Sequence, residues 1–323
     1  MSTKRDFLSM WDINQAEFSA LIRRAEELRF LRQVRTPHAT RPGRMLALIF
    51  EKASTRTRLS FEVAIEELGG HALVIGRNDS QLGRGEPIKD TARVLSRYCH
   101  GIMVRTFGHE RVTELARYSS VPVINGLSDL LHPCQVMADL QTVYAHFAEQ
   151  QGGKTAVPDV LQILRGLRYA WVGDGNNMAN TWIEAAGLLG LDLVLGCPEG
   201  YEPNAQVLAT ARSKGHGRID VVRDPREAVA GRHIVTTDVF ASMGKEGEAE
   251  ERRRAFVGYG VDAALMAKAD SKAVFLHCLP AHRGEEVTDD VIETPASLVW
   301  QEAENRLHVQ KALLEWLFTD TPS

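Results

Sequence analysis

The sequence predicts an α/β protein built from two doubly wound parallel-sheet domains joined by interdomain helices. Short apolar runs typical of buried strands alternate with stretches of helical periodicity, and this alternation indicates parallel sheets covered by helices. The 323 residues suffice for two domains of roughly 100–200 residues each. A polar segment containing glycine and proline, at 149–159, interrupts the alternation and separates two halves.

Each half can be divided into elements by its hydrophobic pattern. In the first half, apolar residues recur at helical spacing from Phe18 to Leu28 and predict an opening helix. The first half is then expected to hold strands at 45–50, 72–75, 102–106 and 121–125, and helices at 59–68, 88–98, 109–118 and about 133–147. The second half is expected to hold strands at 169–174, 192–197, 219–222, 233–239, 273–279 and 297–300, and helices at 179–189, 205–213 and 306–318.

These elements give a first domain over 1–148 and a second domain over 149–304. The C-terminal helix, 305–318, is expected to pack back on the first domain.

Composition narrows the class of protein. With 44% hydrophobic and 25% charged residues the chain is an ordinary globular protein, and its net charge of −4 provides no global field for nucleic acid. No apolar run approaches the ~20 residues needed to cross a membrane, and the N-terminus lacks the apolar core of a signal peptide. The cysteines are far apart and form no CxxC pair, which argues against a disulfide framework or a zinc knuckle and predicts a cytoplasmic location. They are Cys99, Cys134, Cys197 and Cys278.

Polar residues gather where the predicted strands end, and ligands of such sheets bind beyond the carboxyl ends of the strands. Taken singly, each has a plainer interpretation: Arg105 as a surface arginine, His132 as part of a helix entry before proline, and Asp238 as a cap. Their joint placement at strand ends favours a cleft. The groups are Ser54–Arg58, Arg105, His132–Gln135, Gly173–Met178, Asp238 with Ser242–Gly244, His277–Pro280 and Glu302–Arg306.

The run Ser54–Arg58, STRTR, lies between a predicted strand and a predicted helix. Free N–H groups at a helix start favour an anion, and arginine pairs bidentately with phosphate oxygens, so the run predicts a phosphate site. Its alternative interpretation is a capped helix with solvated arginines.

The glycine-rich run Gly173–Met178 invites a comparison with dinucleotide-binding loops. Their third glycine is replaced here by Met178, which argues against NAD or FAD. Asn176 and Asn177 instead offer amide groups suited to an amino-acid head group.

The motifs STRTR, HPCQ, GDGNNM, SMG and HCLP, in this order, resemble those of the ornithine carbamoyltransferases, within the aspartate/ornithine carbamoyltransferase superfamily. The resemblance extends from about residue 5 to about residue 318 and includes AHRGEEVTDDVIE and ENRLHVQKA. STRTR and HPxQ are shared with the wider superfamily, whereas HCLP and SMG are more specific to the ornithine enzymes. The chain departs from many relatives in carrying Phe240 where they carry tryptophan, and Phe240 is expected to pack similarly.

The resemblance implies transfer of a carbamoyl group from carbamoyl phosphate to the δ-amine of L-ornithine, which yields L-citrulline and phosphate. It also implies that the first domain binds carbamoyl phosphate, that the second binds ornithine, and that subunits form trimers. No metal or organic cofactor is implied.

The resemblance also assigns residues to carbamoyl phosphate. Arg105 is expected to reach its phosphate and carbonyl oxygen, and His132 to donate to that carbonyl oxygen. Gln135 is expected to hold the carbamoyl NH2 together with backbone carbonyls near Cys278 and Leu279, and Gln81 to come from an adjacent subunit. The full expected set is Ser54, Thr55, Arg56, Thr57, Gln81, Arg105, His132, Gln135, Cys278, Leu279 and Arg306, with Cys278, Arg105 and His132 as catalytic residues.

For ornithine the resemblance assigns four residues. They are Asn177, in preference to Asn176, with Asp238, Ser242 and Met243. Asp238 is the expected partner of the α-ammonium group, and Cys278 is the candidate proton acceptor for the δ-amine. The SMG segment has the pattern of a lid that excludes water from the reaction.

Two other functions stay open at the level of sequence. One is a carbamoyltransferase for aspartate, putrescine or acetylornithine; the other is a non-catalytic binding module of two α/β domains. Asp238 and SMG favour a cationic amine over aspartate, and putrescine, without a carboxylate, would not need the Asn, Ser and Met set.

Overall fold

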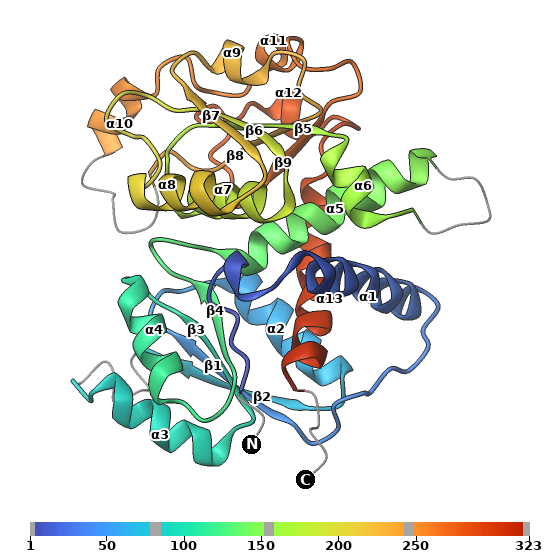
Figure 1. The fold of residues 1–323 in the computed structure, drawn as a ribbon, viewed down its shortest axis with the longest axis vertical. Helices are drawn as coiled ribbons and strands as arrows, with labels where there is room; N and C mark the ends of the chain where they lie inside the picture. Colours follow the sequence, from blue (N-terminus) through green and yellow to red (C-terminus); the bar gives the residue numbers. More distant parts are fainter. Residues whose placement is uncertain (1–3, 78–84, 152–157, 242–248, 319–323) are drawn as a thin grey trace. The chain divides into compact units, whose positions relative to one another are not determined.

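The structure, a computed structural model, describes residues 4–77, 85–151, 158–241 and 249–318 (Figure 1). The chain divides into two compact units, Met1–Gln141 with Glu304–Ser323, and Thr142–Ala303. Both divisions fall inside helices, α5 (Pro133–Gln151) and α13 (Val299–Leu317), so these helices join the units. Each unit contains a parallel sheet, as the sequence predicts.

The first unit is built on a four-stranded sheet in the order β2-β1-β3-β4, with every pair parallel. Its strands are β1 (Met45–Phe50), β2 (His71–Gly76), β3 (Gly101–Arg105) and β4 (Val123–Leu127). Because β1 lies between β2 and β3, the chain passes from β1 to β2 on one side and then crosses to β3 on the other side. The gap between the ends of β1 and β3 is therefore the topological switch point, where such sheets bind ligands.

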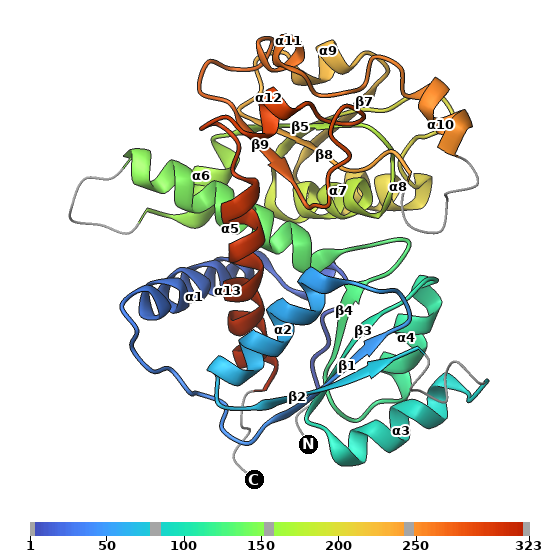
Figure 2. The same cartoon turned by 180° about the vertical axis from the view of Figure 1, so that it is seen from behind.

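Helices cover both faces of this sheet. They are α1 (Gln15–Gln33), α2 (Thr55–Glu67), α3 (Ile88–Tyr98) and α4 (His109–Tyr118), preceded by the short 3-10 turn η1 (Met10–Asp12). On one face Ala92 of α3 and Val112 of α4 pack against Ala47 and Ile102 of the strands. Figures 1 and 2 show α2 and α13 on the opposite face.

The second unit is built on a five-stranded parallel sheet in the order β7-β6-β5-β8-β9. Its strands are β5 (Arg168–Val172), β6 (Asp192–Gly196), β7 (Arg218–Val222), β8 (Ile234–Thr237) and β9 (Val274–His277). Its helices are α6 (Val160–Arg165), α7 (Asn177–Leu189), α8 (Ala205–Lys214), α9 (Pro225–Val229), α10 (Ala249–Ala255), α11 (Ala263–Met266) and α12 (Asp289–Ile292). The switch point of this sheet lies between β5 and β8.

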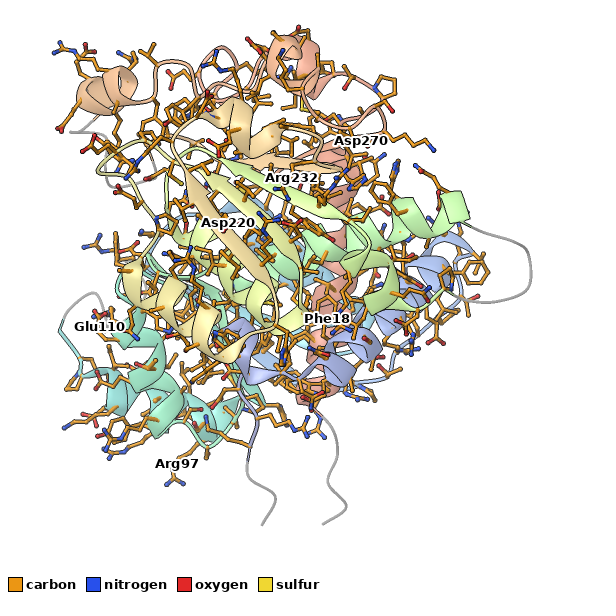
Figure 3. The ribbon with its side chains drawn as sticks, turned by 45° about the horizontal axis from the view of Figure 1, so that its top comes forward. Phe18, Arg97, Glu110, Asp220, Arg232 and Asp270 are labelled. Atoms are coloured by element: carbon orange, nitrogen blue, oxygen red, sulfur yellow. The ribbon has the colours of Figure 1, made fainter. Side chains whose placement is uncertain are left out.

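Charged side chains border the second sheet (Figure 3). On the edge strand β7, Arg218 pairs with Asp220 at 2.8 Å, and Arg232 reaches Asp192 at the start of β6 at 2.7 Å. Charges on an edge strand oppose pairing with strands of other molecules.

One predicted element is wrong. The run 297–300 is not a strand: Ser297 forms only an isolated bridge with Phe275, and Val299 already begins α13. A run of four residues, three of them apolar, fits a strand or a buried helix equally well, and here the helix that follows begins inside the run. Among the described residues we find no helix with the length and apolar character that a bilayer crossing requires.

Candidate functional site

The run predicted to bind an anion, Ser54–Arg58, lies at the start of α2 in the first unit. Ser54 is its N-cap, and its Oγ accepts a hydrogen bond from the Thr57 N–H at 3.3 Å. Within the described residues the N–H groups of Thr55 and Arg56 have no hydrogen-bond acceptor, and they lie at the positive end of a 13-residue helix, where an anion is favoured. Arg56 is half-buried and makes no hydrogen bond or ion pair within the described residues, whereas the exposed Arg58 pairs with Glu62 at 3.3 Å.

Arg306 connects three helices of the first unit. Its Nη2 donates to Thr57 Oγ1 at 2.8 Å, and its Nη1 donates to Gln135 Oε1. Gln135 Nε2 in turn donates to Asp139 Oδ1 at 2.8 Å. Thr57, Gln135 and Arg306 are all at most 3% exposed, so three residues predicted from distant motifs are brought into one buried cluster.

Arg105, the last residue of β3, and His132, the residue directly before α5, are also buried. Burial first, and then the positive charges of Arg306 and Arg105, hold the pKa of His132 well below its ordinary value of 6.5. The imidazole is therefore neutral at physiological pH and can donate one N–H without carrying a charge. Two guanidinium groups and a neutral N–H donor suit a doubly charged phosphate that carries a carbonyl group.

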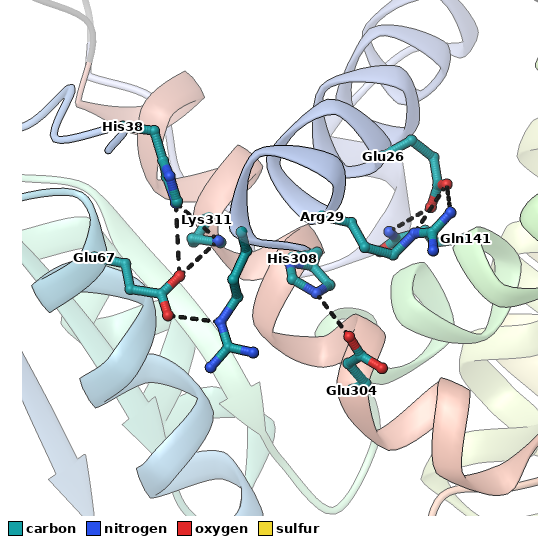
Figure 4. A network of polar contacts seen from close by, with 9 residues as sticks. Glu26, Arg29, His38, Glu67, Gln141, Glu304, His308 and Lys311 are labelled. Carbon is teal, nitrogen blue, oxygen red and sulfur yellow. Dashed lines mark hydrogen bonds and ion pairs between the residues drawn. The ribbon is translucent and has the colours of Figure 1, made fainter. Parts of the chain in front are cut away.

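The position of Arg306 depends on a buried polar network farther along α13 (Figure 4). Lys311 Nζ donates to Glu67 Oε2 at 2.8 Å and to His38 Nε2 at 3.0 Å, which fastens α13 to the last residue of α2. His308, one turn before Lys311, is completely buried, and its Nε2 lies 3.4 Å from Glu304 Oε1. This network fixes α13 against α2 and so directs Arg306 toward Thr57.

Sequence reasoning missed the residues that hold the loop after β1. Glu51 accepts from Arg111 Nη2 at 2.6 Å and from Arg111 Nε at 2.9 Å, and the Thr106 hydroxyl also donates to it. These contacts tie the segment preceding Ser54 to the end of β3 and to α4. The available signal was an acidic residue directly after an apolar strand.

Register places Asp238 beside Cys278 in the second unit. Thr237, the last residue of β8, pairs with His277, the last residue of β9. The next residue of each strand is therefore at the same edge, and Cys278 Sγ donates to Asp238 Oδ1 at 3.2 Å. A thiolate would face a carboxylate here, so the contact favours the protonated thiol.

Asn176 orients Asp238 from the switch point. Its Oδ1 accepts from the N–H groups of Met178 and Ala179 and caps α7, and its Nδ2 donates to Asp238 Oδ2 at 2.8 Å. Asn177 is the first residue of α7 and is half-buried. The family resemblance favours Asn177 as the ligand-binding amide; the structure adds a role for Asn176 in positioning the carboxylate.

The glycine loop after β5 fits closely against its neighbours. A Cβ on Gly175 would lie 2.2 Å from backbone atoms of Glu202 and Pro203, so only glycine fits. Asp174 Oδ2 accepts from Arg252 Nη1 at 2.8 Å, and the same Nη1 donates to the carbonyl oxygen of Phe240 at 2.7 Å. This buried pair, which sequence reasoning also missed, links the glycine loop to the chain that follows Asp238.

Phe240 has the predicted packing role. It is 7% exposed and stacks on Phe256 with ring centroids 4.5 Å apart. Three predicted site residues, Gln81, Ser242 and Met243, lie outside the described residues.

Asp238, His277 and Cys278 each place one potential metal-ligand atom within 4.8 Å of the others. Both ring nitrogens of His277 are already engaged: Nδ1 accepts from the Leu279 N–H and Nε2 donates to Glu286. The thiol donates to the carboxylate as well. These three side chains therefore take part in a hydrogen-bonded network.

Comparison with known proteins supplies the family. The chain matches the carbamoyl-P binding domain of Aspartate/ornithine carbamoyltransferase over residues 5–145, and the Asp/Orn binding domain over residues 165–317. It is 55% identical to an ornithine carbamoyltransferase of Pelobacter propionicus over 97% of this chain and 98% of that protein. It is 52% identical to the anabolic ornithine carbamoyltransferase of Pseudomonas aeruginosa over 97% of each chain.

Solved structures agree. The ornithine carbamoyltransferase of Pyrococcus furiosus matches with a TM-score of 0.88 and 46% identity, over 97% of this chain and 96% of that one. The ornithine carbamoyltransferase of Thermus thermophilus matches with a TM-score of 0.83 and 41% identity, over 98% of this chain and 99% of that one. With the motifs, the two sheets and these relatives in agreement, the chain belongs to the aspartate/ornithine carbamoyltransferase family.

Proposed function

We propose that this protein is an ornithine carbamoyltransferase, which converts carbamoyl phosphate and L-ornithine to L-citrulline and phosphate. The observation that carries the choice of acceptor is the cluster of Asp238, Cys278 and Asn176 at the switch point of the second sheet. A buried carboxylate fixed by two side chains suits a cationic amine and disfavours aspartate, which would add a second negative charge.

Carbamoyl phosphate is assigned to the first unit. Its phosphate would take the free N–H groups at the start of α2, together with Ser54, Thr55, Arg56 and Thr57. Arg105 and Arg306 would neutralise its charge, and Gln135 would hold the carbamoyl NH2. The support is the buried cluster in which Arg306 already contacts Thr57 and Gln135. Gln81, Cys278 and Leu279 complete the proposed set.

The proposed chemistry is direct attack of the ornithine δ-amine on the carbamoyl carbon. A nitrogen–carbon bond forms, the bond from that carbon to the phosphate oxygen breaks, phosphate leaves with the electron pair, and the nitrogen releases a proton. Negative charge grows on the carbonyl oxygen, where the neutral His132 N–H and the Arg105 guanidinium would stabilise it. Because the pKa of His132 is low, donation from its N–H does not depend on pH in the physiological range.

The δ-amine has to lose its proton before attack, since an alkyl amine titrates near pH ~10. Asp238 would hold an ammonium group of ornithine, with Asn177, Ser242 and Met243 completing the site. The Cys278 thiol, which donates to Asp238, would orient that carboxylate in the free protein. To accept the amine's proton it would first release its own proton to solvent, a loss that the positive charge of bound ornithine would favour.

A colorimetric assay of the ureido product, with ornithine, putrescine and aspartate in parallel and carbamoyl phosphate in each, tests this function. The proposal predicts turnover of ornithine with a kcat/KM at least about 100-fold above the other two, a difference of about 2.7 kcal/mol in transition-state binding. Activity confined to putrescine or aspartate would assign a different carbamoyltransferase, and binding of carbamoyl phosphate without turnover would leave a binding module.

We further propose a homotrimer in the cytoplasm that works in arginine biosynthesis. Large apolar side chains are exposed on the first unit, namely Leu59 (54%), Leu73 (42%) and Tyr98 (71%), and such residues support self-association. The four cysteines are free thiols, in keeping with a reducing compartment. Two relatives, from Pseudomonas aeruginosa and Campylobacter jejuni, are named anabolic. Light scattering should give about three times the chain mass of 35.9 kDa.

A further inference from the structure

We propose that His277 is a positioning residue of this reaction, which holds the Cys278–Leu279 segment in its working geometry through one nitrogen, Nδ1. Glu286 holds the ring through the other nitrogen, Nε2, and Glu302 holds the backbone N–H of His277. The inference rests on the proposed function, because it concerns the segment assigned to the carbamoyl NH2 and to ornithine. No part of it requires His277 to touch a substrate.

Three hydrogen bonds fix His277. Its backbone N–H donates to Glu302 Oε2 at 2.9 Å, its Nε2 donates to Glu286 Oε1 at 3.1 Å, and its Nδ1 accepts from the Leu279 N–H at 2.9 Å. His277, Glu286 and Glu302 are at most 1% exposed. Two carboxylates buried this deeply are costly unless they are hydrogen-bonded, and here each has a defined acceptor role.

The two side-chain contacts determine the tautomer. An atom that accepts from a backbone N–H carries no proton, so the ring proton is on Nε2. Glu286 stabilises this form, because its Oε1 accepts from Nε2 and also from the His282 N–H at 2.6 Å. Glu286 therefore keeps Nδ1 available as an acceptor.

The residue that Nδ1 holds is strained. Leu279 has a φ of 55°, in the left-handed region that a residue with a branched side chain rarely adopts. Such a conformation persists only where the surroundings determine it. The hydrogen bond from Leu279 to His277 is such a constraint, and it sets the direction of the neighbouring Cys278 side chain and of the Leu279 carbonyl.

A plainer role for His277 is packing, since its ring lies 6.4 Å from that of Phe275. The two roles make different predictions. Packing depends on the volume of the ring, whereas positioning depends on an acceptor at the place of Nδ1.

Two amide substitutions separate these roles. In His277→Asn the side-chain oxygen can occupy the place of Nδ1 and accept from Leu279, whereas in His277→Gln the amide reaches toward Glu286 and leaves the Leu279 N–H without its acceptor. We predict that kcat for citrulline falls about 100-fold in His277→Gln and less than about tenfold in His277→Asn, because a displacement of about 1 Å near the reacting atoms costs about that much. His216→Gln, an exposed histidine of the same unit, is the matched control and should keep wild-type kinetics.

A second measurement does not depend on activity. Cys278 is the one cysteine of the four that is not buried, so iodoacetamide labelling located by peptide mass spectrometry reports on its surroundings. The labelling rate of Cys278 should change at least about threefold in His277→Gln and stay near the wild-type rate in His277→Asn. If the wild-type protein makes no citrulline, the proposed function fails and the labelling rates alone decide the positioning role.

Equal losses of kcat in both variants, with equal labelling rates, would overturn the inference and leave a packing histidine. Melting curves show whether the variants fold. If neither does, Glu286→Gln, which keeps an acceptor oxygen, is compared with Glu286→Met, which removes it. Retention of kcat within about tenfold in the first and a loss of about 100-fold in the second supports positioning, and equal kinetics in the two overturns it.

Discussion

At the scale of single residues, burial in the first unit determines the protonation state of a histidine. His132 is kept neutral by burial and by two arginines, and so it can act as an uncharged donor beside them. Arg105 and Arg306 keep their charge, because a guanidinium group does not lose its proton in a protein. The result is an electropositive cluster of buried side chains whose uncharged hydrogen-bond donor, His132, does not titrate in the physiological range.

Arg56 tests the anion site. Arg56→Ala should raise the KM for carbamoyl phosphate and lower kcat by at least about 100-fold, because its charge would stabilise phosphate throughout its departure. Steady-state citrulline kinetics measure both values, and Arg58→Ala is the matched control, since Arg58 is exposed and pairs with Glu62. Unchanged kinetics in Arg56→Ala would refute the assignment.

His308 gives a prediction about pH. Burial first, and then the charge of Lys311, lowers the pKa of His308 from 6.5 to about 3 in the folded protein. Below pH 6.5 His308 takes up a proton in the unfolded chain, whereas in the folded chain it stays neutral down to about pH 3. The free energy of unfolding therefore falls as pH falls through this window. The loss is about 2 kcal/mol between pH 7 and pH 5.

Urea unfolding at pH 7 and pH 5 measures this loss, with His308→Gln as the comparison. The variant should be less stable at pH 7 yet lose about 2 kcal/mol less than the wild type on acidification. A parallel fall in both proteins would show that other groups cause the pH dependence.

At the scale of elements, contacts between secondary structures hold three of the segments that carry candidate site residues. Lys311 fastens α13 to α2, Glu51 fastens the end of β1 to α4, and Arg252 fastens the glycine loop to the chain after β8. Loops that carry polar ligands are precise only when such contacts support them.

The Asp174–Arg252 pair is the clearest of these supports, with both side chains at most 6% exposed and 2.8 Å apart. Arg252→Leu should lower the free energy of unfolding by about 3–5 kcal/mol, because it leaves the Asp174 carboxylate buried without its charge partner. Denaturant unfolding measures the change, and Arg253→Leu, at an exposed neighbour, should change it by less than about 0.5 kcal/mol. A loss below about 1 kcal/mol in Arg252→Leu would mean that the pair does not support the loop.

At the scale of the whole molecule, the order of strands explains why short motifs far apart in sequence act together. In each sheet the first strand in sequence, β1 or β5, has later strands on both sides of it. The residues that follow the strands at this switch point lie together at one edge of the sheet. STRTR follows β1 and Arg105 ends β3; the glycine loop follows β5 and Asp238 follows β8. The sheet order therefore converts separate motifs into two sites.

Much of this was predictable from the sequence. The alternation of apolar runs and helical periods predicts both sheets, and the polar residues at strand ends predict Ser54, Asp238 and Cys278, since strand ends in a parallel sheet share an edge. The start of α13 was not predictable, because a short apolar run has no distinguishing period. The contacts of Glu286 and Glu302 with His277 were not predictable either, because these residues lie 9 and 25 positions from it and only the tertiary fold brings them together.

The most direct test of the account is the kinetics of Asp238→Asn with each substrate varied in turn. Asn keeps the shape of the side chain and removes the charge that we assign to the ammonium group of ornithine. We predict that kcat/KM for ornithine falls about 100-fold, because a charge-assisted hydrogen bond is lost, while the KM for carbamoyl phosphate changes less than about twofold. An equal loss for both substrates, or an unchanged kcat/KM for ornithine, would contradict the assignment of ornithine to this site.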